Sequence, residues 1–249
     1  TIPAPNFKAA LIAHDPVIDT NADGEIQVSE ASAITFAIYV NEKNISDMTG
    51  IEAFTNTLAL YCHENQITNL NLENNTALYQ VIAWSNQIES INVSNSPNLF
   101  NISISENNLT SLDVKNNPAL KTLVIGYNSI SSIDLSHNPL LETFSTLDNP
   151  FVSLDLSASP VLTFVSVQAS SQLRHINIQN GNTAGLRLYL AGVPSMECVR
   201  VDSDILGAIP GDWTYPEGTH FSDSCTMGME EISVSQPEIY PNPVRNQFN

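Results

Sequence analysis

The sequence predicts an elongated solenoid in which short, mostly β coils stack and form one parallel sheet along its length. The first observation is a polar residue that returns at a constant interval through the middle of the chain. These positions are Asn65, Asn86, Asn107, Asn128 and Asn149, each number exceeding the one before it by 21, and Ser170 takes the next place. The second observation is that apolar residues keep the same repeat interval, as at Leu60, Val81 and Ile102. A unit of this size cannot bury its apolar side alone, so neighbouring units must stack.

Composition excludes several classes of partner. The 249 residues carry a net charge of −18, and only eight of them are Lys or Arg. Such a surface repels phosphate backbones and anionic lipid headgroups, so we expect neither a nucleic-acid nor a polybasic membrane partner. No run approaches the roughly 18 uninterrupted apolar residues of a membrane-spanning helix, so no transmembrane segment is expected. We expect a monomer.

Residues 1–50 do not follow the repeat and are expected to form an N-terminal cap. They contain a twelve-residue segment, 19–30, that resembles an EF-hand calcium loop, with Gly24 at the position of the sharp turn. The six liganding positions would be Asp19, Asn21, Asp23, Glu25 through its backbone carbonyl, Gln27 and Glu30. Two short helices, over 7–13 and 30–37, are expected on either side of this loop.

Only one such loop occurs, whereas calcium sensors pair two. The resemblance therefore implies a structural calcium ion that fastens the cap, with the affinity of extracellular modules, about 10⁻⁴ to 10⁻³ M. The alternative is an acidic turn that matches the motif by chance. After the loop, residues 38–40 resemble a repeat strand, and Asn44 stands one repeat interval before Asn65, so Asn44 is expected to begin the asparagine ladder inside the cap.

From residue 57 each unit reads L-x-x-L-x-L-x-x-N-x-L-x-x-L-x-L, most clearly over 120–135. The first L-x-L should be a short strand that pairs in parallel with its neighbours. The asparagine should stand where the chain leaves this strand, because its amide can donate to and accept from backbone groups that would otherwise be buried unpaired. The second L-x-L is too short for a helix and should line the opposite wall as an extended or 3₁₀ segment.

This pattern is the leucine-rich-repeat signature, and its L-D-L-S-x-N-P variant resembles the internalin-J-like repeats of bacterial surface proteins. The resemblance implies an α/β-type leucine-rich-repeat solenoid, mostly β, over residues 51–185. The expected architecture is a right-handed curved stack with a parallel concave sheet, a short helical N-terminal cap and a disulfide-locked C-terminal cap.

The C-terminal cap is expected over residues 186–226, with a final strand at 196–201. Cys198 and Cys225 are interpreted as a disulfide that closes this cap, and the segment resembles the C-terminal caps of secreted repeat proteins from Bacteroidetes-type bacteria. Two reduced thiols are the alternative. Cys62 holds an inward strand position and is interpreted as a small core residue.

Residues 227–249 are interpreted as a polar linker followed by a truncated sorting domain. Tyr240-Pro-Asn-Pro243 resembles the opening of the C-terminal sorting domain of the type IX secretion system, which implies a secreted or cell-surface protein. A chance proline-rich tail is the alternative.

No catalytic constellation is found, because the five histidines fall in different elements and none has a nucleophile or metal-ligand partner at a recognised spacing. We therefore expect no enzyme. The acidic residues Asp113, Asp134 and Asp155 also recur at the repeat interval and should cap exposed turns.

The concave face offers the candidate binding surface. The period places one exposed patch on its first coils, formed by Tyr39, Tyr61, His63, Ile82 and Trp84. Exposed Trp and Tyr are typical of protein interfaces and of sugar-binding platforms. We therefore expect a non-enzymatic, secreted or cell-surface, adhesin-like scaffold that binds a protein on this face. A carbohydrate-binding accessory module of a larger secreted protein is the alternative, a structural stalk is a third, and the rings could also only cover the cap junction.

Overall fold

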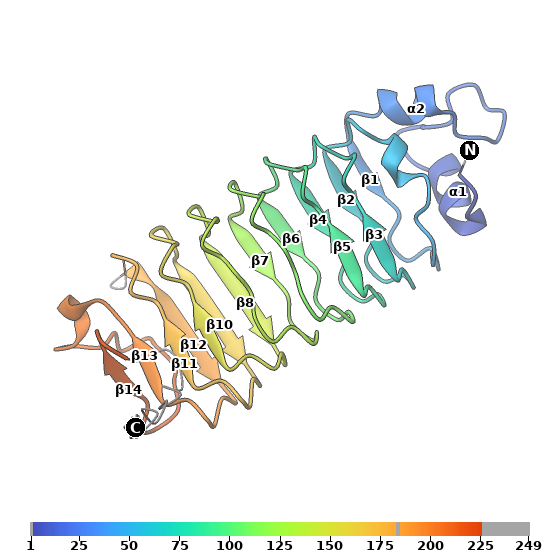
Figure 1. The fold of residues 1–249 in the computed structure, drawn as a ribbon. Coiled ribbons are helices and arrows are strands. Elements are labelled where there is room, and N and C mark those ends of the chain that lie inside the picture. The colour runs from blue at the N-terminus through green and yellow to red at the C-terminus, as the bar shows by residue number, and fades with distance from the viewer. Residues whose placement is uncertain (1, 183–184, 226–249) are drawn as a thin grey trace, which may run out of the picture.

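The structure is a computed structural model that describes residues 2–182 and 185–225, and it is one long stack of coils (Figure 1). Helices α1 (Pro5–Ile12) and α2 (Val28–Ala33) lie at one end of this stack. An eight-stranded parallel sheet runs along it. Its strands, in spatial order, are β1 (Ala37–Tyr39), β2 (Ala59–Tyr61), β4 (Gln80–Ile82), β6 (Asn101–Ser103), β7 (Thr122–Val124), β8 (Thr143–Leu147), β10 (Phe164–Gln168) and β12 (Arg187–Ala191). The predicted solenoid with a parallel sheet is confirmed.

Short strands on the opposite wall close the coils. β3 (Asn69–Asn71) pairs with β5 (Ser90–Asn92). Nearer the C-terminus a four-stranded sheet consists of β9 (Ser153–Asp155), β11 (His175–Asn177), β13 (Cys198–Arg200) and β14 (His220–Ser222). The second L-x-L of the repeat therefore forms an extended strand in the coils that contain β3, β5, β9 and β11. Short 3₁₀ turns cover Ile51–Ala53 and Ser203–Ile205.

The register of the long sheet follows the repeat interval and fixes which residues point inward. The aligned, fully buried positions are Leu60, Val81, Ile102, Leu123, Phe144 and Val165. Burying such a side chain stabilises the folded state by about 1.5–3 kcal/mol. The core is consequently one continuous apolar column between the two walls.

The asparagine ladder joins each coil to the one before it. Asn107 Nδ2 donates to the carbonyl of Ala83 in the preceding coil at 3.0 Å, and to those of Ile104 and Ser105 in its own coil. Its Oδ1 accepts from Ile88 N–H at 2.8 Å. The same arrangement of donors and acceptor recurs at Asn86 and Asn128. Asn65 and Asn149 also donate to a carbonyl of the preceding coil and accept from one of its N–H groups. Backbone groups that the strands leave unpaired are satisfied in this way.

Asn44 is not a rung of this ladder, contrary to the expectation from its spacing. Tyr39 pairs with Tyr61, and this step is one position longer than the repeat interval, so the position equivalent to Asn65 is Lys43. Asn44 falls one residue beyond it, is exposed and has φ +53°. Asn65 still reaches the cap, since its Oδ1 accepts from the backbone N–H groups of both Lys43 and Ile45.

A second ladder on the opposite wall was missed at the sequence level. Asn117 Nδ2 donates to Val93 and Ser96 carbonyls, and Ser96 Oγ donates to the Asn75 carbonyl. Its fully or nearly fully buried members are Asn75, Ser96, Asn117, Asn138, Ser159 and Asn180. Serine replaces asparagine at two of these six positions, so the letter pattern is broken although both side chains donate to backbone carbonyls.

A column of left-handed residues precedes the asparagine ladder. Its members, all with φ between +51° and +57°, are Glu64, Ser85, Glu106, Tyr127, Asp148 and Ala169, and Glu42 is their equivalent in the cap. A left-handed conformation costs an L-residue about 1–2 kcal/mol. From Glu64 to Asp148, the amide hydrogen bonds of the asparagine that follows each of these residues hold the chain in this turn.

The N-terminal cap differs slightly from its prediction. Both helices start two residues earlier than expected, and α2 also ends earlier, so that the chain can extend into β1. α1 begins with Pro5, whose missing N–H is not needed in a first turn. α2 begins early because Gln27 and Glu30 form a capping box at its start.

At the C-terminal end, β13 lies within the predicted final strand, but it is not the last one, since β14 pairs with it in parallel. β12 belongs to the eight-stranded sheet although it falls in the predicted cap, and the step from Val165 to Leu188 is two positions longer than the repeat interval. Cys198 and Cys225 form a disulfide with their Cα atoms 6.2 Å apart. The interpretation of 227–249 as linker and sorting domain lies outside the described residues.

Cys62 is buried and free, as expected for a core residue. Burial raises the pKa of its thiol to about 12, so the side chain stays neutral. In the described part of the chain no helix has the length and apolar character needed to cross a membrane.

Candidate functional site

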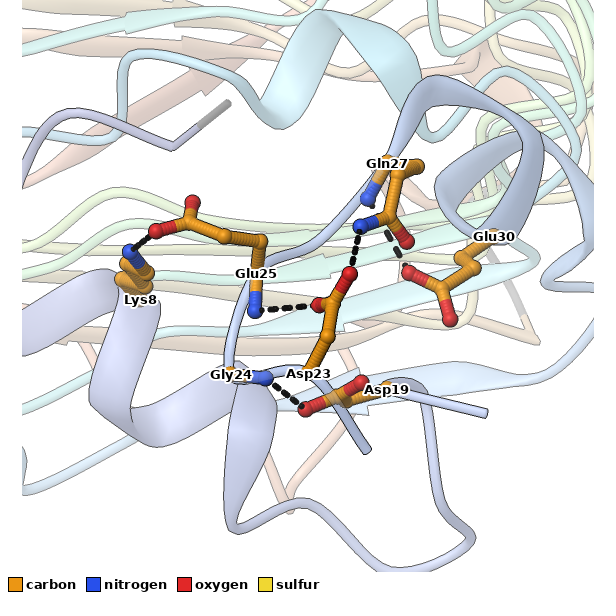
Figure 2. Close-up of polar contacts among 7 residues, drawn as sticks. All are labelled: Lys8, Asp19, Asp23, Gly24, Glu25, Gln27 and Glu30. Carbon is orange, nitrogen blue, oxygen red and sulfur yellow. Dashed lines mark hydrogen bonds and ion pairs between the residues drawn. The ribbon is translucent and has the colours of Figure 1, made fainter. Parts of the chain in front are cut away.

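The EF-hand-like segment forms a closed acidic loop between α1 and α2 (Figure 2). Gly24, with φ +78°, turns the chain so that its N–H donates to Asp19 Oδ2 at 3.0 Å. Asp23 N–H donates to Asn21 Oδ1, and Glu25 N–H donates to Asp23 Oδ1, both at 2.9 Å. The side chains at the first, third and fifth positions are thus held by backbone donors of the loop itself.

Glu30 and Gln27 close the other side of the loop. Gln27 Nε2 donates to Asp23 Oδ2 at 2.8 Å, and Gln27 N–H donates to Glu30 Oε2 at 3.0 Å. Glu30 Oε1 accepts from the N–H and hydroxyl of Thr20 and from Asn21 N–H. The Gln27 N–H, ahead of the donors from Thr20 and Asn21, lowers the pKa of Glu30 below its ordinary 4.5, although burial acts in the opposite direction. Glu30 is therefore held as a carboxylate.

One carboxylate oxygen of this loop is left without a partner. Asp19 is only 7% exposed, and its Oδ1 is buried with no hydrogen bond, while Oδ2 accepts from Gly24. A buried, unsatisfied carboxylate oxygen costs about 1–3 kcal/mol or more. The loop thus contains an acceptor for which the described chain supplies no donor.

Glu25 points its carboxylate away from the other acidic groups, toward α1. Lys8 contacts Glu25 Oε1, as Figure 2 shows. The sequence did not identify Lys8 as part of this site, because nothing in its local pattern links it to the loop. The Glu25 backbone carbonyl remains the group expected to ligate an ion.

The donor set defines what the loop could hold. Four carboxylates and two side-chain amides gather within twelve residues, and within the described chain their one ion pair is that of Glu25 with Lys8. Oxygen ligands of this type suit hard divalent cations, and a loop of this length with Gly at its sixth position suits calcium. A cation would also reduce the repulsion among Asp19, Asp23 and Glu30.

His14 connects the loop segment to the edge of the long sheet. It is 6% exposed, lies just after α1 and accepts a hydrogen bond from Tyr39 N–H at its Nε2, 3.0 Å away. Its Nδ1 lies 2.9 Å from the carbonyl of Pro16, so the proton is assigned to Nδ1. β1 is the outer strand of the sheet, and His14 satisfies an N–H that would otherwise be left at an open edge.

Four of the five residues expected in the aromatic patch form two stacked pairs on the first coils, and all of the five except Tyr39 are partly buried. Tyr39 and Tyr61 stack with ring centroids 4.7 Å apart, and His63 and Trp84 stack at 4.4 Å. Ile82 is aligned with Tyr61 in the next strand and is half-buried. Tyr39 is 50% exposed. His14 also stacks on Tyr39 at 6.1 Å, so the patch is continuous with the cap.

A third stacked pair beside the patch was not predicted. Tyr79 and Phe100 immediately precede β4 and β6 and stack at 5.4 Å with nearly parallel rings. Phe100 is 37% exposed. The two positions are one repeat interval apart, so the period could have revealed this pair if the positions before each strand had been aligned.

An acidic group borders the patch. The ligand atoms of Glu42, His63 and Glu64 lie within 4.8 Å of one another, and His63 Nδ1 is buried without a hydrogen-bond partner. Glu42 and Glu64 occupy the left-handed column on consecutive coils. The aromatic rings are therefore flanked by negative charge.

The comparisons with known proteins support the fold class alone. No protein-family model matches the sequence, and no curated protein is similar to it. Among solved structures, the functional domain of InlJ from Listeria monocytogenes, which includes a cysteine ladder, has a TM-score of 0.55 at 19% identity, over 89% of this chain and 70% of that one. An internalin C2 from the same organism has a TM-score of 0.46 at 16% identity, over 89% and 94%.

The fold that this chain shares with the InlJ domain is the leucine-rich-repeat solenoid. The chain differs from that domain in its use of cysteine, since Cys62 is the single cysteine within residues 51–185. In this chain, asparagine side chains form hydrogen bonds between adjacent coils.

Proposed function

We propose that this protein is a non-enzymatic interaction scaffold that binds a partner protein through the aromatic patch of Tyr39, Tyr61, His63, Ile82 and Trp84. The observation that carries the proposal is the pair of ring stacks on consecutive coils, with Tyr39 half exposed. Rigid aromatic side chains lose little conformational entropy on binding and contribute large apolar areas, which is why they dominate protein interfaces.

The middle of the same sheet face serves as an internal contrast. From β6 to β8 most outward side chains are small or hydroxylated, such as Ser103, Thr122 and Ser145. Such residues offer little apolar area, so the binding energy should concentrate on the first coils. The acidic group beside the patch favours a partner surface with positive charge.

The protein is proposed to act outside the cytoplasm. The Cys198–Cys225 disulfide supports this, because structural disulfides persist in oxidising compartments. A secreted or surface-attached location is also what an adhesin-like role requires.

The experiment is affinity capture with the immobilised full chain and two variants. Tyr61→Ala with Trp84→Ala removes one ring from each stack. Phe164→Ala is the matched control, because Phe164 is 38% exposed on the same sheet but lies far along the array in β10. A protein retained by the wild type and by the control, and lost from the double variant at unchanged melting temperature, supports the patch. Equal retention by all three contradicts it.

Carbohydrate binding at the same rings is the second candidate, supported by the exposure of the Tyr39 side chain. A glycan array distinguishes the two functions. Sugar binding predicts hits that disappear with Trp84→Ala, whereas a protein-binding patch predicts none.

A further inference from the structure

We propose that the loop 19–30 binds a calcium ion, and that the bound ion holds His14 on the outer edge of the eight-stranded sheet and so orders the aromatic patch. The inference is independent of the proposed function, because ion binding and the order of the sheet edge are both measurable without a partner.

The first step is the unpartnered oxygen. Asp19 is more than nine-tenths buried, its Oδ2 is used by Gly24 N–H, and its Oδ1 has no hydrogen bond. One oxygen of this carboxylate is thus anchored to the turn, and the other remains available to ligate an ion. A cation is the partner that would satisfy Oδ1, because the described chain places no donor there.

The second step is that the remaining ligands are already close. Asn21, Asp23 and Gln27 are joined through their side chains by hydrogen bonds of 2.8–3.2 Å. Glu30 is held at the start of α2 by the capping box. Ion binding would exchange these side-chain contacts for metal–oxygen bonds without refolding the loop.

The third step is the short connection from the ion to the sheet. Asp19 and His14 are separated by four residues, of which Ile18 is fully buried. The carbonyl of Pro16 in this segment accepts a hydrogen bond from His14 Nδ1, and His14 Nε2 accepts one from Tyr39 N–H. Fixing Asp19 therefore restrains the segment that positions the imidazole. Lys8 on α1, through Glu25, adds a second connection between loop and helix.

The last step leads from Tyr39 to the patch. Tyr39 stacks on His14 and on Tyr61, so its ring is the member of the patch that touches the cap. If the cap loosens, Tyr39 loses both its edge hydrogen bond and one stacking neighbour. Rings at the other end of the array, such as Phe164, have no such connection.

Calcium binding is tested by isothermal titration of the full chain with calcium chloride. We expect one site with a Kd of about 10⁻⁴ to 10⁻³ M, and at least about tenfold weaker binding for Asp19→Asn. Asp134→Asn is the matched control, an exposed turn aspartate whose substitution should leave the Kd unchanged. Glu42→Gln with Glu64→Gln removes the other acidic group and should also leave it unchanged. No heat of binding for the wild type overturns the site.

The coupling is tested by hydrogen exchange of the wild type with and without calcium, which needs no variant. The Tyr39 amide should exchange at least about tenfold more slowly with calcium, while amides of β7 and β8 should not respond. His14→Ala should keep calcium binding but abolish the calcium effect at Tyr39. Calcium binding with unchanged Tyr39 exchange in the wild type overturns the coupling, as does a calcium effect that survives in His14→Ala.

Discussion

The two ends of the solenoid solve the same problem with different chemistry. Each end must cover an open sheet edge and an exposed core. At the N-terminus a buried imidazole caps β1, and an acidic loop holds the segment that carries it. At the C-terminus the chain covers itself: Thr214 exchanges hydrogen bonds with β12, Trp213 Nε1 donates to the Leu186 carbonyl, and a disulfide closes the segment. The N-terminal closure consists of hydrogen bonds, whereas the C-terminal closure also includes a covalent bond.

The largest expected effect is on the covalent end. The disulfide joins cysteines at a sequence separation of 27. Replacing both cysteines, Cys198→Ser with Cys225→Ser, should lower the free energy of unfolding by about 3.5 kcal/mol on the chain-entropy account. Urea denaturation measures this change, and hydrogen exchange should place the loss in β13 and β14.

Reducing agent provides the control for that comparison. It should destabilise the wild type by a similar amount and leave the double variant unaffected, since Cys62 is already a free thiol. Loss of protection in α1 or α2 on reduction would contradict the independence of the two ends.

The next effect compares a position inside the asparagine ladder with its C-terminal position, where Ser170 replaces asparagine. Asn107→Ala leaves the N–H of Ile88 without its partner, whereas the carbonyls of Ala83 and Ile104 keep the hydrogen bonds from Asn86 and Asn128. Because a buried unpaired group costs about 1–3 kcal/mol and the hydrogen bonds of the Asn107 amide are lost as well, the loss should be about 3 kcal/mol. Ser170→Ala removes one long hydrogen bond, 3.4 Å to the Gln168 carbonyl. It should cost less than about 1 kcal/mol. Thermal denaturation of both variants measures the difference in stability. Equal losses of stability would show that the Asn107 amide does not stabilise the contact between coils.

The smallest effect concerns the acidic turns between the two ends. The Lys115 side chain, then its N–H, lowers the pKa of Asp113 below its ordinary 3.8, and the Ser136 hydroxyl, then its N–H, does the same for Asp134. A lowered folded-state pKa contributes stability that is complete above the unfolded value and is lost as pH falls through the folded one. The melting temperature should therefore decrease as the pH is lowered below about 4. This decrease should be smaller in Asp134→Asn than in the wild type. A melting temperature that rises from pH 5 to pH 3 would contradict the assignment.

The period predicted what repeats and failed where the chain stops repeating. Leu60, Val81 and Ile102 recur at the repeat interval and are all buried, because every coil from Leu60 to Val165 has the same length. Asn44 was misplaced because the cap joins the array with a longer step, from Tyr39 to Tyr61. β14 was missed because it follows a long connection that carries no repeat signal.

Contacts across the fold were beyond the reach of sequence spacing. His14 and Tyr39 lie 25 residues apart, and no local pattern links them. The left-handed column was hidden for another reason: Glu64, Tyr127 and Asp148 are not the glycines that usually mark such a backbone. The loop 19–30, in contrast, is a local motif whose candidate ligands lie close together in the sequence, so spacing alone could propose them.

The ladder has a direction, and this makes the two ends unequal in how the array could be shortened. Each rung from Asn86 to Asn149 donates to a carbonyl 24 residues earlier and accepts from an N–H 19 residues earlier. Removing coils from the C-terminus therefore deprives the remaining last coil of the side chain that satisfied it. Removing coils from the N-terminus leaves every retained coil with its own rung.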